Sequence, residues 1–176
     1  TDTGVGESTF TQLGEAFDFS SDSLYAAIDF SGTTQVTVSH WQRPTNQNST
    51  QLVYELTADV NAANDGFFRA LETNGCGGGY CSTAAIKGNA GYNVASSSFP
   101  VENLYTHIVD VFDTTISSGP ESDTYLNGVN QNTVNVTGLA FNNTNTFAND
   151  TFYIGSRAAN NFYYEGQMDE FRIADT

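Results

Sequence analysis

Paired carboxylates are the first chemical feature to look for in this chain, because a retaining glycosidase needs two of them about 5 Å apart. The nearest approach is Glu121-Ser122-Asp123, which lacks a second glutamate at the spacing that one strand would need. Asp169 and Glu170 are adjacent, and neighbouring residues of a strand point to opposite faces. The spacing of the Ser, His and Asp residues does not suggest a catalytic triad. We therefore expect a protein that is not an enzyme.

The only cysteines, Cys76 and Cys81, are separated by three glycines and a tyrosine. Half of a zinc site is one interpretation, but the chain has no second cysteine pair, and His40 and His107 lie in distant segments. A local disulfide is favoured, because glycines let the chain fold back sharply. Closing so short a loop removes only about 2 kcal/mol of unfolded-state entropy. The bridge would shape a loop more than hold the fold, and it indicates an oxidising compartment.

Aromatic and amide side chains in two polar segments are the candidates for ligand binding. Tyrosine rings stack on the faces of sugars, and asparagine carboxamides hydrogen-bond with sugar hydroxyls. The candidates are Tyr80, Tyr92, Asn93, Asn160, Asn161, Tyr163 and Tyr164. Because these residue types are also ordinary in turns and in packing, a structural role stays open for each of them.

The charge balance excludes two classes of partner. The chain has 176 residues, with 5 basic against 20 acidic side chains and a formal net charge of −15. Such a surface repels phosphate backbones and anionic lipids, so we expect neither nucleic-acid binding nor binding to a membrane surface. No stretch approaches the ~20 consecutive apolar residues of a membrane helix, so membrane insertion is not expected. The first residue is Thr1, without a leader, which is typical of a processed or excised segment.

The elements that must position these residues are predicted to be short strands. β-Branched and aromatic residues are common, and no segment keeps a helical period over three turns. The expected strands are 16–19, 24–28, 35–42, 51–57, 66–71, 105–112, 124–126, 133–139, 151–154 and 167–173. Asn127-Gly128 is a type I′ hairpin signal, because both residues tolerate positive φ. Thr73 to Ser98 and Asp113 to Asp123 lack strand character and are expected to be functional loops.

This pattern predicts an all-β chain, a single domain over residues 1–176, folded as a two-sheet antiparallel jelly-roll β-sandwich. The alternating apolar positions of the expected strands should form the core between the sheets. The expected core residues are Phe17, Phe19, Val36, Val38, Ile108, Phe152, Ile154, Met168, Phe171 and Ile173.

Five motifs in a fixed order give the chain a family resemblance. They are Leu13 to Phe19 followed by Leu24 to Ile28, Val36 to Trp41, Asn103 to Val109, Tyr125 to Gly128, and Phe152 to Gly155 followed by Tyr164 to Ile173. In this order they resemble the laminin-G/pentraxin-like jelly-roll domains of the concanavalin A-like lectin/glucanase superfamily. Tyr105 stands where that family usually has Trp, and the Cys76–Cys81 loop belongs to none of its patterns. The resemblance implies that strand 16–19 pairs with strand 167–173.

The superfamily contains glucanases, lectins and adhesive domains, so the fold alone does not decide the function. The expected function is non-catalytic recognition of a glycan or polysaccharide, or adhesion, at an extracellular, cell-surface or virion surface. The alternative is a structural or decoration protein of a virion capsid or tail, whose partners would be capsid or fibre proteins. A glycoside hydrolase is less favoured, because the paired carboxylates are missing.

The resemblance also implies a structural Ca²⁺ site. It places a candidate carboxylate at Asp169, next to the strand that carries Asp18, and Asp22 could complete the set. Calcium takes six to eight oxygen ligands, from carboxylates, carbonyls and water. The alternative is that Asp18 and Asp22 only organise the turn at 20–23 through side-chain hydrogen bonds to the backbone.

Overall fold

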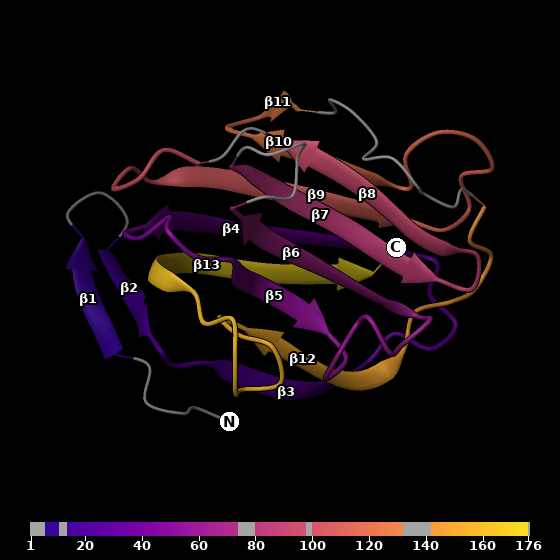
Figure 1. Ribbon diagram of the computed structural model, residues 1–176, viewed down its shortest axis with the longest axis horizontal. Coiled ribbons are helices and arrows are strands. Elements are labelled where there is room, and N and C mark those ends of the chain that lie inside the picture. Colours follow the sequence, from indigo (N-terminus) through magenta and orange to yellow (C-terminus); the bar gives the residue numbers. More distant parts are fainter. Residues whose placement is uncertain (1–5, 11–13, 74–79, 98–99, 132–141, 176) are drawn as a thin grey trace.

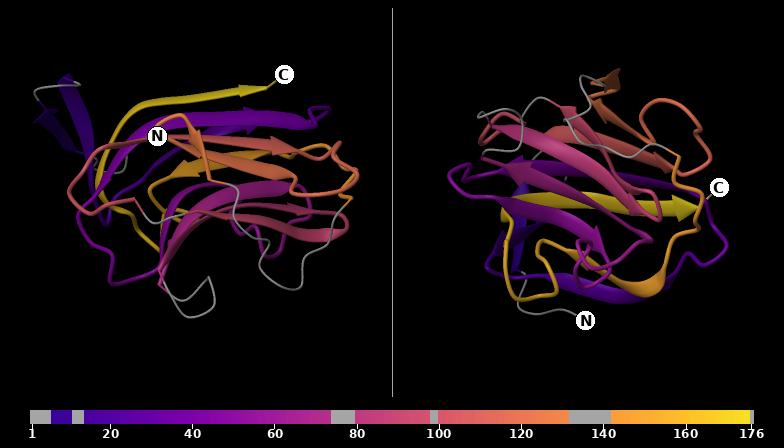
Figure 2. Two further views of the ribbon diagram at one scale, coloured as in Figure 1. Left: turned by 90° about the horizontal axis from the view of Figure 1, so that it is seen from above. Right: turned by 45° about the vertical axis from the view of Figure 1, so that its right-hand side comes forward.

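The computed structural model describes residues 6–10, 14–73, 80–97, 100–131 and 142–175. These residues form strands in two sheets, which lie face to face (Figures 1 and 2). In spatial order, the seven-stranded sheet contains β1 (Gly6–Phe10), β2 (Gly14–Ser20), β13 (Glu165–Asp175), β4 (Gln35–Pro44), β9 (Thr106–Asp113), β10 (Ser122–Leu126) and β11 (Val129–Asn130). The six-stranded sheet contains β3 (Leu24–Asp29), β12 (Asn149–Ile154), β5 (Gln51–Leu56), β6 (Gly66–Glu72), β7 (Cys81–Gly88) and β8 (Gly91–Ser97).

Neighbouring strands pair antiparallel, and the described residues contain no helix, so none of them forms a helix that could cross a membrane. The expected pairing of the two ends of the chain is confirmed. Phe17 of β2 lies opposite Met168 of β13, and Ser20 lies opposite Glu165. The all-β jelly-roll sandwich that the alternating pattern predicted is therefore the observed fold.

The core lies between the sheets and is rich in aromatic rings. Tyr54 on β5 is fully buried and stacks on Phe152 with ring centroids 5.8 Å apart. Phe67 on β6 stacks on Phe112 of the opposite sheet at 4.6 Å. Each fully buried side chain of this size contributes about 1.5–3 kcal/mol through removal from water. The alternating burial of β4 and β9 turns one face of each strand toward this core.

One expected core residue is exposed. Phe17 has 41% of its surface accessible, although it points to the same face as its buried partner Met168. The reason is its position: β1 and β2 extend the seven-stranded sheet beyond the six-stranded one, which Figure 2 shows clearly on the left. Ile154, Phe171 and Ile173 are partly buried and pack against the core.

The interpretation of Thr73 to Ser98 as a functional loop is wrong, because β7 and β8 occupy most of it. Most side chains of β7 are buried, on both faces, so the period of two that marks a half-buried strand is missing. Its residues are also small, in place of the large β-branched and aromatic residues that signal a strand. The segment predicted at 133–139 lies outside the described residues.

Two turns follow the prediction. Asn127 and Gly128 have φ values of 49° and 80°, as a type I′ hairpin requires, and they join Leu126 to its partner Val129. The polar connection between β9 and β10 covers residues 114–121, within the loop expected at Asp113 to Asp123.

Candidate functional site

Two loops meet over the outer face of the six-stranded sheet, the face turned away from the core. The connection 57–65 follows β5, and residues 156–164, here called the recognition loop, follow β12. In Figure 1 the two loops approach β5 from its two ends. Beneath them a small apolar cluster covers this face, made by Leu52, Val60, Phe68, Ala70 and Ala85.

Arg157 joins the two loops. Its Nε donates to Glu55 Oε2 at 3.0 Å, and its Nη1 lies 3.5 Å from Asp59 Oδ1. Glu55 is fully buried, and its other oxygen accepts the Val60 N–H at 2.7 Å. Burial raises the pKa of Glu55, while the Val60 N–H and Arg157 act in the opposite direction. The guanidinium is therefore fixed in position by a buried carboxylate.

The recognition loop holds an aromatic ring outward on this fixed guanidinium. Arg157 Cζ lies 5.2 Å from the ring centroid of Phe162, a cation–π geometry, and 43% of Phe162 is exposed. Ala158, Ala159 and Phe162 all have positive φ, which L-residues adopt only at a cost. The loop is closed by the Arg157 N–H, which donates to the Asn161 carbonyl at 2.9 Å. This geometry presents one face of the ring to a ligand.

The structure brings several of the predicted ligand residues to this surface. Asn160 and Asn161 are exposed in the recognition loop, and Tyr163 is half-buried, with its hydroxyl donating to the Ala159 carbonyl. Tyr92 reaches the same surface from β8, because its hydroxyl donates to Asn61 Oδ1. Burial raises the pKa of Tyr92, and Arg157 acts to lower it, so the two side chains share one electrostatic environment.

Two predicted ligand residues are structural. Asn93 is fully buried, and its Oδ1 accepts the Glu121 N–H at 2.9 Å. Tyr164 is also fully buried, in edge contact with Phe19 at 6.1 Å. Neither side chain reaches the surface, so both assignments as ligand residues are corrected. Tyr80 is 59% exposed and precedes β7, two strands away from β5 in the sheet.

Phe162 and Arg157 were missed in the sequence. Both residues lie beside Asn160 and Asn161, which were predicted, so the right segment was found. The sequence of a polar segment does not show, however, that its phenylalanine and its arginine stack on each other. That contact depends on Glu55, which is about a hundred residues away.

The expected disulfide stays a prediction. Cys81 is buried at the start of β7, and Cys76 lies outside the described residues.

The three carboxylates predicted to bind calcium do not form one cluster. Asp18 on β2 and Asp169 on β13 share the outer face of the seven-stranded sheet. Burial raises the pKa of Tyr105 on this face, and the charges of Asp169 and Asp18 add to that effect. Asp22 lies in the turn after β2, and its carbonyl faces Gly155. Among the described residues, no three His, Cys, Asp or Glu side chains gather as metal ligands would. The calcium site therefore stays a prediction.

A serine and a histidine are in contact on the outer face of the seven-stranded sheet. Ser39 Oγ lies 3.1 Å from His107 Nε2, and Trp41 packs against the imidazole at 5.0 Å. A serine nucleophile also needs a carboxylate that orients its base. Within the described part of the chain, no carboxylate is hydrogen-bonded to this imidazole, so the pair does not make a triad.

The family model of the concanavalin A-like lectin/glucanases superfamily, in its laminin-G form, matches residues 19–176. The chain belongs to this family, as the order of its motifs indicated. No curated protein matches it in sequence.

Solved structures share the fold at low sequence identity. Domain 4 of AbnA, an extracellular arabinanase from Geobacillus stearothermophilus in complex with arabinotriose, is 18% identical with a TM-score of 0.67, over 98% of this chain and 75% of that one. A carbohydrate-binding module of a Ruminococcus gnavus sialidase, bound to α2,3-sialyllactose, is 11% identical with a TM-score of 0.54, over 80% and 76%. A heptameric pentraxin from Limulus polyphemus is 14% identical with a TM-score of 0.56, over 80% of this chain and 64% of the pentraxin.

Proposed function

We propose that this domain recognises a neutral glycan without catalysis, and that the Phe162 ring is the surface on which a sugar stacks. The observation that carries the proposal is an exposed aromatic ring backed by a guanidinium that a buried carboxylate holds in place. We extend the proposal to an extracellular or particle surface, where glycans are displayed.

The recognition loop offers the two kinds of contact that sugars use. The apolar C–H face of a pyranose or furanose ring packs on an aromatic face, and its hydroxyls need donors and acceptors around that face. Phe162 supplies the ring, and the exposed carboxamides of Asn160 and Asn161 supply donors and acceptors from the same loop. Since the loop is already held in its strained conformation, little ordering entropy is lost on binding.

Charge favours a neutral ligand over an acidic one. Arg157, the cation that lies against Phe162, is already paired with Glu55 and Asp59. The chain carries a net charge of −15, which repels acidic sugars at long range.

Two arguments support recognition without catalysis. A glycosidase needs two carboxyl groups free to reach the glycosidic bond. At this site the Glu55 oxygens are occupied by the Val60 N–H and by Arg157, and the side chain has no exposed surface. Similar folds are also found with saccharides bound, among them the arabinanase domain with arabinotriose.

A glycan array compares the wild-type chain with Phe162→Ala, with Phe17→Ala as the matched control. Both phenylalanines are similarly exposed, at 43% and 41%, but Phe17 lies on β2. Arabinotriose serves as a neutral probe and α2,3-sialyllactose as an acidic one. We expect binding to neutral glycans, weakened about tenfold by Phe162→Ala and unchanged by Phe17→Ala.

The proposal fails if the wild-type chain binds no glycan on the array, or if Phe162→Ala binds as tightly as the wild type. Preference for sialyllactose over the neutral glycans would overturn the charge argument. Because both substituted rings are exposed, circular dichroism of the variants should match that of the wild type.

A further inference from the structure

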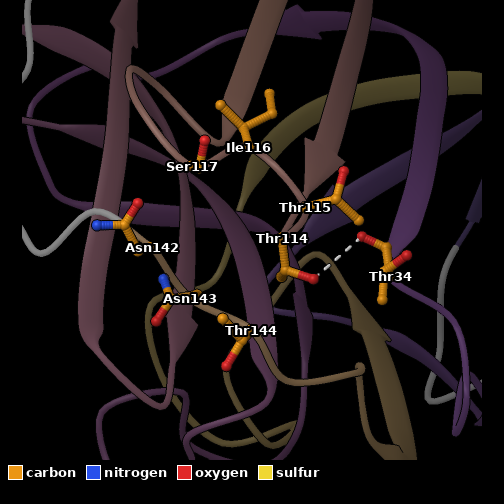
Figure 3. Close-up of a pocket in the computed structure, with 8 residues that line it drawn as sticks. All are labelled: Thr34, Thr114, Thr115, Ile116, Ser117, Asn142, Asn143 and Thr144. Carbon is orange, nitrogen blue, oxygen red and sulfur yellow. Dashed lines mark hydrogen bonds between the residues drawn. The ribbon is translucent and has the colours of Figure 1, made fainter.

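A pocket of about 230 Å³ opens at one end of the sandwich (Figure 3). It is formed by Thr34 before β4, by residues 114–117 after β9 and by residues 142–144 before β12. The segment that carries residues 142–144 continues to Ala148, whose N–H donates to the Asp65 carbonyl just before β6. The pocket therefore lies at the end of the sandwich where β6 begins. The recognition loop lies at the opposite end, where the Leu52 N–H at the start of β5 donates to the Phe162 carbonyl.

Seven of the eight residues that line the pocket carry a hydroxyl or an amide, but most of the surface that they expose there is apolar. Its walls are Thr34, Thr114, Thr115, Ile116, Ser117, Asn142, Asn143 and Thr144. None of these side chains is ionisable, and the one large apolar group is Ile116. Such a lining matches an uncharged ligand that has an apolar face and a few hydroxyls, as a sugar ring does.

The threonine hydroxyls of the lining already make hydrogen bonds within the protein, some as donors and one as an acceptor. Thr114 Oγ1 donates to the Asn145 carbonyl at 2.8 Å, and Thr115 Oγ1 donates to Asp113 Oδ1 at 2.6 Å. The Thr114 side chain is almost fully buried, and its hydroxyl also lies 3.4 Å from the Thr34 carbonyl (Figure 3), so it holds the wall of the pocket together and is not open to a ligand. Thr115 is exposed, and because its hydrogen is used, its oxygen can only accept from a ligand. Thr144 Oγ1 accepts from Asn89 Nδ2 at 3.0 Å and keeps its own hydrogen for donation. The pocket therefore offers an acceptor at Thr115 and a donor at Thr144, which suits hydroxyls that both donate and accept.

The wall that carries Asn143 is rigid. The residue is almost fully buried, and it binds the buried Glu121 carboxylate twice, through its N–H at 2.7 Å and through Nδ2 at 2.6 Å. Its Oδ1 accepts the Ala90 N–H at 2.8 Å. Gly88 lets this wall approach the β7–β8 turn, since a Cβ there would lie 2.6 Å from Asn145 Oδ1. A pocket held this firmly needs little reorganisation to bind a ligand.

We propose that this pocket is a second binding site, which takes a single neutral sugar unit. Its volume is below the range of about 300–1,000 Å³ that is typical of pockets for drug-sized ligands, and it suits one sugar ring. The pocket shares no residue with the recognition loop, so either site can fail without the other. With sites at two ends of the sandwich, one copy of the domain joins two glycan chains, or two parts of one chain.

The test is a titration of backbone amide signals by NMR, with the methyl glycosides of glucose, galactose, mannose, xylose and arabinose as probes and glycerol as the control. The variant Ser117→Tyr fills the pocket from an exposed position, and Ser118→Tyr is the matched control at the next exposed residue, outside the lining. We expect one or more glycosides to shift the amides of Thr114, Ser117 and Thr144 with millimolar affinity, in the wild type and in Ser118→Tyr. Ser117→Tyr should lose these shifts.

Three results would overturn the second site: no glycoside shifts these amides, glycerol shifts them as strongly as the sugars, or both tyrosine variants respond alike. Signals of residues 157–162 report on the recognition loop in the same spectra. Shifts there without shifts at the pocket would reject this inference and leave the proposed function standing, and the reverse pattern would reject the role of Phe162 alone.

Discussion

Arg69 and Asp110 form an ion pair between the two sheets, with Arg69 Nη1 2.6 Å from Asp110 Oδ1 and both side chains fully buried. Asp110 on β9 also accepts hydrogen bonds from the hydroxyls of Tyr54 and Thr124. Arg69 on β6 donates through Nη2 to Ser82 Oγ at 2.6 Å. Both Asp110 oxygens and both terminal nitrogens of Arg69 are hydrogen-bonded in the core, while Arg69 Nε has no partner among the described residues. These bonds across the core fix how the two sheets face each other.

Removing one charge of this pair should be much worse than removing both. Asp110→Asn leaves the buried Arg69 without its counter-charge, and we expect it to lower the free energy of unfolding by about 3–5 kcal/mol. The double variant Arg69→Met, Asp110→Leu removes both charges at similar volume and should cost less than Asp110→Asn. Urea unfolding followed by circular dichroism measures both. A double variant less stable than Asp110→Asn would contradict the argument.

His40 should make the domain less stable in mild acid. The imidazole is fully buried, with Nε2 3.0 Å from Gln42 Oε1, and burial lowers its pKa to about 4. Between pH 6.5 and about 4 the unfolded chain binds a proton that the folded chain does not, so stability falls as the pH falls. The loss reaches about 3 kcal/mol at the lower end of this window. His40→Gln should have a smaller stability loss over the same window in urea unfolding.

Two buried carboxylates change stability in the opposite direction as the pH falls, so the His40→Gln variant is needed as a reference. Burial raises the pKa of Glu55 and of Glu72, so their protonation favours the folded state as the pH falls. They are present in both proteins, and the difference between the two pH profiles isolates His40. Parallel profiles would show that His40 is not the cause.

Much of the fold was predictable because alternation survives where a strand has one buried and one accessible face. Buried and partly exposed residues alternate along β4 and β9, and both strands were predicted from the sequence. The pairing of β2 with β13 followed from the order of the motifs. β7 was missed because both of its faces are covered, which removes the period of two, and because most of its buried residues are small.

The candidate site was only partly predictable, because its geometry depends on contacts between distant segments. Asn160 and Asn161 could be found as amides in a polar run near the end of the chain. That Arg157 backs Phe162 depends on Glu55, whose buried position no local pattern reveals. The same limit explains Asn93, which has the composition of a loop ligand but supports the Glu121 backbone inside the fold.

Gly155 should be intolerant of a side chain for a steric reason that can be separated from backbone strain. Its φ is +83°, and a Cβ there would lie 2.7 Å from Cε1 of the buried Phe19. Gly119 also has positive φ, +104°, but no heavy atom lies within 4 Å of its Cβ position. We expect Gly155→Ala to cost about 2–4 kcal/mol and Gly119→Ala about 1 kcal/mol, measured by urea unfolding. Equal costs would leave strain alone as the cause.

Breaking the ion pair beneath the recognition loop should lower the free energy of unfolding by an amount that depends on pH. Arg157→Gln leaves the buried Glu55 carboxylate with the Val60 N–H but without its counter-charge, so the pKa of Glu55 rises further above its ordinary value. At pH 7 we expect a loss of about 2 kcal/mol, because the charged form is poorly compensated. At pH 4 the carboxyl is largely protonated, and the loss should shrink.

Arg172→Gln is the matched control for this experiment, because its ion pair with Glu170 is exposed to solvent on both sides. Exposed pairs contribute little, so we expect no measurable change at either pH. Urea unfolding at pH 7 and pH 4 of the three proteins gives the comparison. If the Arg157→Gln loss is the same at both pH values, the Glu55 charge is not what holds Arg157. The support for Phe162 would then come from the loop backbone, through the hydrogen bond from the Leu52 N–H to the Phe162 carbonyl.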